Sequence, residues 1–222
     1  MAMKNKAIIE FFEDKLSEYE MFADRIQSYI TRNTVLKKNV HSFKRRTKDL
    51  THLDKKIDRK NEKLKASGSP EINSENAQKN ITDIIGIRVL HLHQGQFDSI
   101  HKELMTYVER GDIFLYETPK AYTWDPEYAK YFKSLDIITE EKESFYTSVH
   151  YVFKASEKSD VTCEVQVRTL LEEVWGEIDH AVNYPEENEN QIIKEQLKIF
   201  ARIVGAGTGM SHSILKIHES KL

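Results

Sequence analysis

The sequence predicts an α+β protein, with a mixed β-sheet core and flanking N- and C-terminal helices. Three observations support this class. Apolar residues recur at helical spacing in the first thirty residues, strict alternation marks two later segments, and helical spacing returns after Leu170. A chain of 222 residues suits one sizeable domain with helical additions. We place the boundaries at residues 1–36 for an N-terminal helical region, 37–185 for the main domain and 186–222 for C-terminal helices.

The N-terminal part begins with an amphipathic pattern. Between residues 3 and 31 the apolar residues fall three or four positions apart, which predicts one long helix. Val40 to Arg46 fits a short strand, and Thr51 to Asp54 fits a helix start that resembles a capping box. The stretch Ser67 to Pro70 predicts a loop.

The middle of the chain alternates between strand and helix signals. Ile84 to Leu92 is rich in β-branched residues, as in a buried strand. A helix through Phe97 and Val108 should end at Gly111, and Ile113 to Tyr116 should form a second strand. Residues 117–144 lack clear periodicity, so we expect a long loop or short helix near the functional site.

The last third predicts a hairpin followed by helices. Residues 145–153 and 161–168 both alternate and are separated by a polar turn. Helical spacing covers Leu170 to His180, and another helix is expected from about Glu187 to Val204. The glycines between 205 and 209 should end that helix, with a short terminal helix after them.

Composition excludes several classes of protein. A single cysteine, Cys163, rules out an intrachain disulfide framework and a zinc site with several cysteines. The first residues contain no apolar core of a secretory signal, and no apolar run approaches the ~20 residues that cross a bilayer. We therefore expect a cytoplasmic protein with no membrane partner.

Charge is distributed unevenly along the chain. From Lys37 to Lys65 there are twelve basic and four acidic residues, a net charge of +8, whereas the whole chain carries −3. Such asymmetry favours contact with an anionic partner, although a solvated helix face is the ordinary alternative.

Chemically varied side chains share one face of the predicted hairpin. Glu164, Gln166 and Arg168 alternate with apolar residues in one strand. In the other strand the corresponding polar positions are Tyr146, Ser148 and His150. An ordinary solvated face would be less varied, so this pattern indicates a functional site.

Two acidic residues could hold a metal ion near that face. Asp83 opens the strand that contains Arg88, and Glu164 lies in the hairpin. Mg²⁺ usually binds one or two carboxylates together with substrate phosphates, so this pair suits Mg²⁺. No glycine-rich GxxxxGK[ST] loop is present, and the GAGTG sequence at 205–209 lacks its lysine.

Four segments, in this order, resemble the RelA/SpoT alarmone synthetase family, especially its small single-domain members. They are residues 44–56, 82–89, 145–153 and 164–184. The resemblance implies a nucleotidyltransferase-like sheet core in residues 37–185. It also implies transfer of the β,γ-pyrophosphate of ATP to the ribose 3′-hydroxyl of GDP or GTP, which makes the chain a GTP pyrophosphokinase-type enzyme producing (p)ppGpp.

The resemblance assigns roles to residues on the donor side. Arg46 and Lys48 match the basic pair that contacts ATP, and Lys56 matches a lysine near its phosphates. Asp83 matches the Mg²⁺ ligand, and Arg88 matches a catalytic arginine of the same strand.

On the acceptor side, the resemblance implies that Tyr146 stacks on the acceptor base, with Ser148 and His150 beside it. Glu164 matches the acid that assists the metal and activates the 3′-hydroxyl. Gln166 and Arg168 line the same face.

The departures from the family pattern concern the acceptor. Phe145 stands where the family usually has glycine, an acidic stretch from Asp136 to Glu143 replaces a basic one, and His52 replaces a serine. The amino-acid sequences of residues 147–151 and 172–180 resemble those of toxic members of the family. Some of those members modify the 3′-CCA end of tRNA, and others use adenosine nucleotides.

Several alternatives therefore remain open at this point. The acceptor is GDP or GTP, an adenosine nucleotide, or tRNA in a growth-inhibiting toxin. A catalytically inactive nucleotide-binding regulator is a further hypothesis, but Asp83 and Glu164 argue against it. An antitoxin protein and a second copy of the chain are open as partners.

Overall fold

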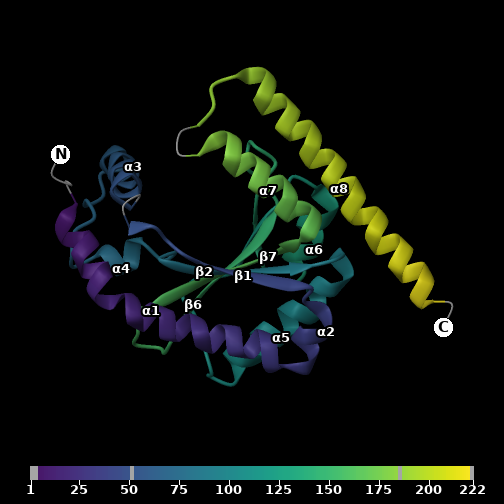
Figure 1. The fold of residues 1–222 in the computed structure, drawn as a ribbon, viewed down its shortest axis with the longest axis horizontal. Helices are drawn as coiled ribbons and strands as arrows, with labels where there is room; N and C mark the ends of the chain where they lie inside the picture. The colour runs from purple at the N-terminus through teal and green to yellow at the C-terminus, as the bar shows by residue number, and fades with distance from the viewer. Residues whose placement is uncertain (1–4, 51–52, 185–186, 221–222) are drawn as a thin grey trace.

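One β-sheet separates two groups of helices (Figure 1). The computed structural model describes residues 5–50, 53–184 and 187–220. Within these residues, helix α1 (Lys6–Arg32) and helix α5 (Phe97–Glu109) lie on one side of the sheet, and helix α7 (Leu170–Asn183) and helix α8 (Gln191–Glu219) lie on the other. This arrangement confirms the predicted α+β class with flanking helices.

In the described part of the chain, seven strands form the sheet. They are β1 (Ser42–Thr47), β2 (Ile85–His91), β3 (Phe114–Leu115), β4 (Lys120–Tyr122), β5 (Ile138–Glu140), β6 (Ser148–Lys154) and β7 (Thr162–Thr169). The order is β1-β2-β7-β6-β4-β5, and β3 pairs with β6. Strands β2 and β7 run parallel and β6 and β7 antiparallel, so the sheet is mixed and the predicted hairpin is confirmed.

The core lies between the sheet and helices α1 and α5. Period-two alternation turns Val165 and Val167 of β7 and Ile87 of β2 toward these helices, and all three are buried. Phe12 and Ile26 of α1 pack in the same cluster. The apolar stripe predicted in residues 3–31 is therefore the buried face of α1.

Short helices connect these elements. Helix α2 (Thr34–Asn39) begins one residue after α1 ends. Asn33 caps its start, because the Asn33 side chain accepts hydrogen bonds from the backbone amides of Val35 and Leu36. Helix α4 (Ala77–Asn80) precedes β2, and the 3₁₀ turn η2 (Gln94–Gln96) leads into α5.

Helix α3 (Leu53–Ala66) lies at the end of the polar side of the sheet. It buries Leu53 and Ile57, as the predicted spacing requires. The capping signal at Thr51 and His52 falls outside the described residues.

Residues 117–144 are more regular than the sequence indicates. They contain β4, helix α6 (Pro126–Lys133) and β5, where we expected a loop or one short helix. Asp125 caps α6 and Pro126 occupies its first turn. The two strands are three residues each, which is too short for period two to be visible.

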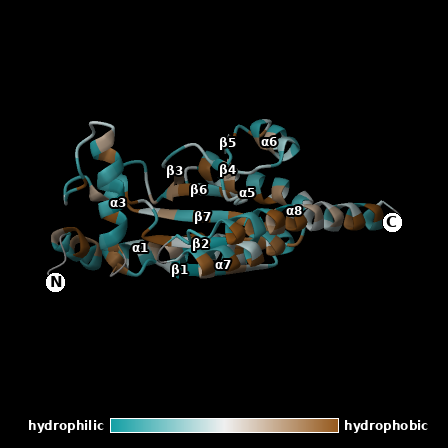
Figure 2. Ribbon diagram, turned by 90° about the horizontal axis from the view of Figure 1, so that it is seen from above, coloured by the Kyte–Doolittle hydropathy of each residue, from teal (hydrophilic) through white to brown (hydrophobic). Residues whose placement is uncertain are grey.

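Helix α8 corrects another prediction. It continues through residues 205–209, where the glycines were expected to end it. A Cβ on Gly205 would lie 2.9 Å from Trp124 Cζ2, and one on Gly207 would lie 3.1 Å from Leu171 Cδ1. Two of these glycines therefore allow close packing along α8 and do not act as helix stops. The far end of α8 projects beyond the sheet (Figure 2).

Helix α7 is held by a cap at its first turn and by a contact with α8. Thr169 and Glu172 form a capping box at its start. Trp175 is buried and its Nε1 donates to Leu197 O of α8 at 2.9 Å. The two helices therefore cover the polar face of the sheet as one antiparallel pair.

The composition also led to predictions about membrane spans and about the single cysteine. None of the helices in the described ranges combines the length and the apolar character needed to span a bilayer. Cys163 is fully buried on the apolar face of β7, as its alternation predicts, and burial raises the pKa of its thiol to about 12.

Candidate active site

A cleft lies on the polar face of the sheet, across β1, β2 and β7. It is lined by Arg46, Lys48, Asp83, Gly86, Ile87, Arg88, Glu164 and Gln166. The strand register explains this gathering. Gly86 of β2 pairs with Arg46 of β1 on one side and with Glu164 of β7 on the other. Two residues further along β2, Arg88 pairs with Gln166 of β7.

Gly86 keeps the centre of the cleft open. It stands between Arg46 and Glu164 in the sheet, and a Cβ at this position would lie 3.3 Å from Glu164 O. Any side chain here would also occupy the space between the guanidinium and the carboxylate. The sequence analysis did not select Gly86, although a glycine inside a strand signals a close approach.

Asp83 forms salt bridges with two lysines at one end of the cleft. Lys48 Nζ lies 2.5 Å from Asp83 Oδ2, and Lys56 Nζ lies 2.6 Å from Asp83 Oδ1. Lys48 follows β1 and Lys56 comes from α3, so two elements deliver their ammonium groups to the start of β2. We call Arg46, Lys48, Lys56 and Asp83 the donor end of the cleft, after the role that the sequence resemblance predicts for them.

Burial and the neighbouring charges both shift the pKa values of Asp83 and Lys48. Burial alone favours the neutral acid, but the two ammonium groups outweigh it and hold the pKa of the Asp83 carboxyl well below its usual range. Burial also lowers the pKa of Lys48 to about 8, although Asp83 acts in the opposite direction. Asp83 is therefore ionised at neutral pH.

Glu164 is held by a hydrogen-bonded chain at the other end. His150 Nδ1 donates to Glu164 Oε1 at 3.1 Å, and Gln166 Nε2 donates to Oε2 at 2.7 Å. His150 Nε2 lies 3.0 Å from the Tyr146 hydroxyl. Burial opposes ionisation of Glu164, but the hydrogen bond and charge of His150, together with Gln166, lower its pKa. The carboxylate is therefore ionised and has a fixed orientation.

The surroundings of Tyr146 are aromatic. Its ring lies 5.8 Å from Tyr122, 6.1 Å from Trp175 and 5.8 Å from the Arg168 guanidinium. Burial raises the pKa of Tyr146, so its hydroxyl stays protonated beside His150 Nε2. We call Tyr146, His150 and these neighbours the acceptor end, after the role that the sequence resemblance predicts for Tyr146 and His150.

Ser148 and Arg168 point less directly into the cleft than predicted. Ser148 is buried, and its hydroxyl has no hydrogen-bond partner among residues 5–50, 53–184 and 187–220. Arg168 is almost fully buried and pairs with Glu173 of α7. Neither residue lines the cleft, although each occupies the predicted face.

Two glutamates of α7 belong to this site and were missed from sequence. Glu173 Oε1 lies 3.0 Å from Arg88 Nη1, and Glu173 also pairs with Arg168; Glu177 pairs with Arg88 as well. Gly176 leaves room for this network, since a Cβ there would lie 2.6 Å from Arg168 Nη1. The available signal was the i, i+4 spacing of the two glutamates on one face of a predicted helix.

Tyr122 is a further residue that the sequence analysis missed. Its ring packs edge-on against His150 at 4.9 Å, and Lys142 Nζ lies 4.5 Å from the ring centroid. It reaches the site because β4 pairs with β6, with Tyr122 opposite Ser148. No periodic signal marks β4, so its position could not be predicted.

The carboxylates of the cleft suit a magnesium ion. Asp83 and Glu164 line one cleft and both have lowered pKa values, so they present ionised hard oxygen ligands. No cluster of three or more potential metal ligands is found among the described residues. A pair of carboxylates fits an ion that also binds substrate phosphates, and does not fit a closed protein cage.

This fold and cleft define a class of protein in which cations and paired carboxylates face an open cleft on a mixed sheet. The region found in RelA/SpoT proteins matches residues 45–189. The chain therefore belongs to the RelA/SpoT family, which confirms the resemblance seen in the sequence. No curated protein sequence matches the chain significantly.

Solved structures show the same fold. A GTP pyrophosphokinase family protein from Streptococcus pneumoniae is 20% identical, with a TM-score of 0.64 over 95% of this chain and 94% of that one. The small alarmone synthetase 1 of Bacillus subtilis bound to AMPCPP is 18% identical, with a TM-score of 0.65 over 94% and 98%. Its complex with the product pppGpp is 19% identical, with a TM-score of 0.57 over 92% and 93%.

Proposed function

We propose that the protein is a pyrophosphokinase that transfers the β,γ-pyrophosphate of ATP to the ribose 3′-hydroxyl of GDP or GTP. The observation that carries this proposal is the cleft in which Lys48, Lys56 and Asp83 face Glu164 across Gly86. The matched family region includes all of these residues, and one relative of the same fold has been solved with AMPCPP and, in a second structure, with pppGpp.

The donor end suits the triphosphate of ATP. Phosphoryl transfer needs positioning and charge neutralisation more than covalent chemistry from the protein. Lys48 and Lys56 supply ammonium groups for phosphate oxygens, and Arg46 and Arg88 present guanidinium groups on the same face. Asp83 and Glu164 would hold Mg²⁺, which neutralises phosphate charge when it is bound.

The acceptor end suits a nucleoside with a free 3′-hydroxyl. Tyr146 offers a ring on which a base can stack, worth roughly 1–3 kcal/mol. Glu164, oriented by His150 and Gln166, accepts the hydroxyl proton as the 3′-oxygen bonds to the β-phosphorus of ATP. The bond between the β-phosphorus and the α,β-bridging oxygen breaks, and AMP leaves with that oxygen.

A second acceptor is favoured by a specific observation. The outer face of α3 exposes Lys55, Arg59 and Lys63 beside the donor end of the cleft. Such a basic surface suits the phosphate backbone of a nucleic acid, so the 3′ end of tRNA is the alternative acceptor.

Product labelling separates these acceptors. Purified protein is incubated with γ-³²P-ATP and Mg²⁺, with GDP, GTP, ATP or deacylated tRNA offered in parallel. We expect label in the pyrophosphorylated products of GDP and GTP, separated from the labelled donor by chromatography. Label in tRNA alone would establish the alternative, and label in an adenosine nucleotide that carries an added pyrophosphate and migrates apart from ATP would identify an adenosine nucleotide acceptor. No labelled product with any acceptor would overturn the proposed activity.

A matched control variant excludes contaminating enzymes. Glu164→Gln keeps the shape of the side chain and removes its charge, so the labelled product should disappear while the melting temperature stays near that of the wild type.

A further inference from the structure

Phe145 has a backbone conformation that bulky residues avoid. Its φ is +64°, in the left-handed region where a Cβ clashes with the following carbonyl. In the described part of the chain, the other non-glycine residue with positive φ is Asp136, whose short polar side chain tolerates this region. Phe145 ends a turn in which its amide donates to Lys142 O at 2.9 Å. Such strain persists only where surrounding contacts enforce it.

The enforcing contacts are made by the Phe145 ring. The ring stacks on Trp124 at 5.5 Å with an interplanar angle of 24°. The Arg202 guanidinium of α8 lies 5.2 Å from the ring centroid, and Lys198 Nζ lies 6.0 Å from it. Residues from the loop after β4 and from α8 therefore hold one side chain in place.

Trp124 is itself fixed against α8. A Cβ on Gly205 would come within 2.9 Å of Trp124 Cζ2, so the indole can approach the helix this closely because residue 205 has no side chain. This contact accounts for a glycine in the middle of a long helix, where alanine would be more favourable.

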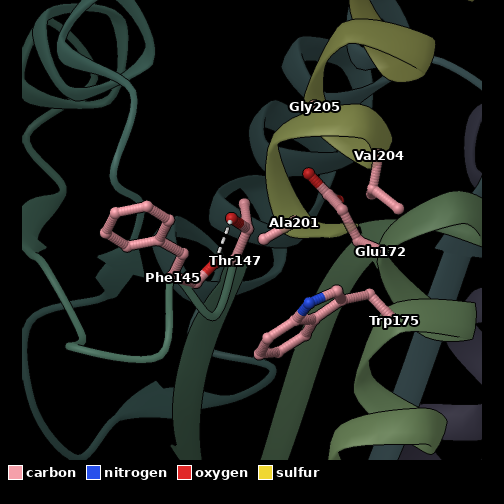
Figure 3. Close-up of a pocket in the computed structure, with 7 residues that line it drawn as sticks. All are labelled: Phe145, Thr147, Glu172, Trp175, Ala201, Val204 and Gly205. Carbon is pink, nitrogen blue, oxygen red and sulfur yellow. Dashed lines mark hydrogen bonds between the residues drawn. The ribbon is translucent and has the colours of Figure 1, made fainter. Parts of the chain in front are cut away.

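The next residue along the chain is Tyr146, which connects Phe145 to Glu164. Tyr146 bonds to His150, and His150 bonds to Glu164, at 3.0 and 3.1 Å. Phe145 and Thr147 also line a small pocket against α7 and α8, to which Trp175, Ala201 and Gly205 contribute (Figure 3). Thr147 Oγ1 donates to Phe145 O at 3.4 Å within this segment.

We propose that Phe145 is a positioning residue for the acceptor. Its ring, held between Trp124 and Arg202, keeps the backbone in the left-handed region and thereby aims Tyr146 at the acceptor base. Helix α8 is then part of the support of the acceptor end, although it contributes no side chain to the cleft lining. This inference rests on the proposed function, since it assigns a role in acceptor binding.

Three substitutions of Phe145 separate the ring from the backbone. Phe145→Gly removes the ring and relieves the strain, Phe145→Leu removes the ring and keeps the strain, and Phe145→Tyr keeps the ring. The measurement is the KM for the acceptor that takes label, with the KM for ATP as an internal control. We expect Phe145→Gly and Phe145→Leu to raise the acceptor KM about tenfold or more while the KM for ATP stays constant. Phe145→Tyr should keep the acceptor KM of the wild type. Wild-type acceptor KM in Phe145→Gly would overturn the proposal.

A remote pair of variants tests the same contact from α8. Gly205→Ala places a methyl group against Trp124, whereas Gly209→Ala adds the same group to the same helix with nothing within 4 Å of it. We expect Gly205→Ala to raise the acceptor KM and Gly209→Ala to leave it unchanged. Equal acceptor KM values in the two variants would contradict a supporting role for α8.

A second readout keeps this inference apart from the proposed function. If the wild type labels none of the four acceptors, the proposed function fails and amide hydrogen exchange decides the positioning role. Faster exchange at residues 145–147 in Phe145→Leu than in Gly209→Ala would support it. Equal exchange in both variants would reject it.

Discussion

The donor and acceptor ends of the cleft are built differently. The donor end is charged and comes from neighbouring elements, β1, α3 and β2, within residues 42–91. The acceptor end is aromatic, and its parts come from β4, β6, β7 and α7, with α8 behind them. The comparison teaches that the charged end is built from residues close together in the sequence, whereas the aromatic end depends on packing between distant segments.

The largest effect should come from the carboxylate between the two ends. Glu164→Gln is expected to lower kcat by about 10²–10³-fold, because it removes the charge that accepts the hydroxyl proton and helps to hold the metal. Initial rates of pyrophosphate transfer measure this effect. A rate within tenfold of the wild type would remove Glu164 from the reaction and with it the link between the ends.

Glu173 links the acceptor end to the cleft lining, because it pairs with Arg168 of β7 and with Arg88 of β2. Its side chain is 12% exposed and that of Arg168 is 2% exposed. Glu173→Ala would leave a buried guanidinium without its partner, so we expect a loss of about 3 kcal/mol in the free energy of unfolding. Urea denaturation measures the loss. A change below 1 kcal/mol would show that water replaces the carboxylate.

Tyr146 should affect the acceptor end alone. Tyr146→Ala is expected to raise the acceptor KM by about 5–150-fold, which corresponds to roughly 1–3 kcal/mol of stacking. Tyr146→Phe is the matched control, since it keeps the ring and removes the hydroxyl that meets His150. An equal rise in the KM for ATP would show that the two ends are not separable.

The smallest effect concerns pH at the donor end. With a pKa of about 8, Lys48 becomes neutral as pH rises above 8 and no longer attracts phosphates. We expect kcat/KM for ATP to fall by up to about tenfold per pH unit above that point. In Lys48→Arg this fall should disappear, because arginine stays charged.

Stability provides the control for this pH profile. The pKa of Lys48 lies below its ordinary value of 10.5, so the unfolded chain binds more protons between about pH 8 and 10.5. Lys48 therefore adds stability as pH rises through this window, and lost activity there does not reflect its contribution to unfolding.

Much of the sheet and the donor end could be predicted from the sequence. Period two placed Glu164 and Gln166 on one face of β7, opposite buried Cys163 and Val165. The parallel pairing of β2 with β7 then brought Gly86 beside Glu164, which local patterns alone could not show. The resemblance selected Lys48 and Lys56, and the structure places both on Asp83.

The packing around the acceptor end could not be predicted from the sequence, for physical reasons. Tyr146 lies before β6 begins at Ser148, so its orientation depends on the left-handed turn at Phe145 and not on strand alternation. The length of α8 was underestimated because glycine usually ends helices, and packing on Trp124 and Leu171 was invisible in the sequence. Tyr122 required a three-residue strand that no periodicity reveals.

The burial of Cys163 has a practical consequence. It is the one cysteine of the chain, and its thiol is fully covered and strongly disfavoured as a thiolate. Maleimide dyes should therefore leave the native protein unmodified. A cysteine introduced at exposed Met210 of α8 would carry a single fluorophore, so the helix could be tracked spectroscopically without replacing the natural thiol.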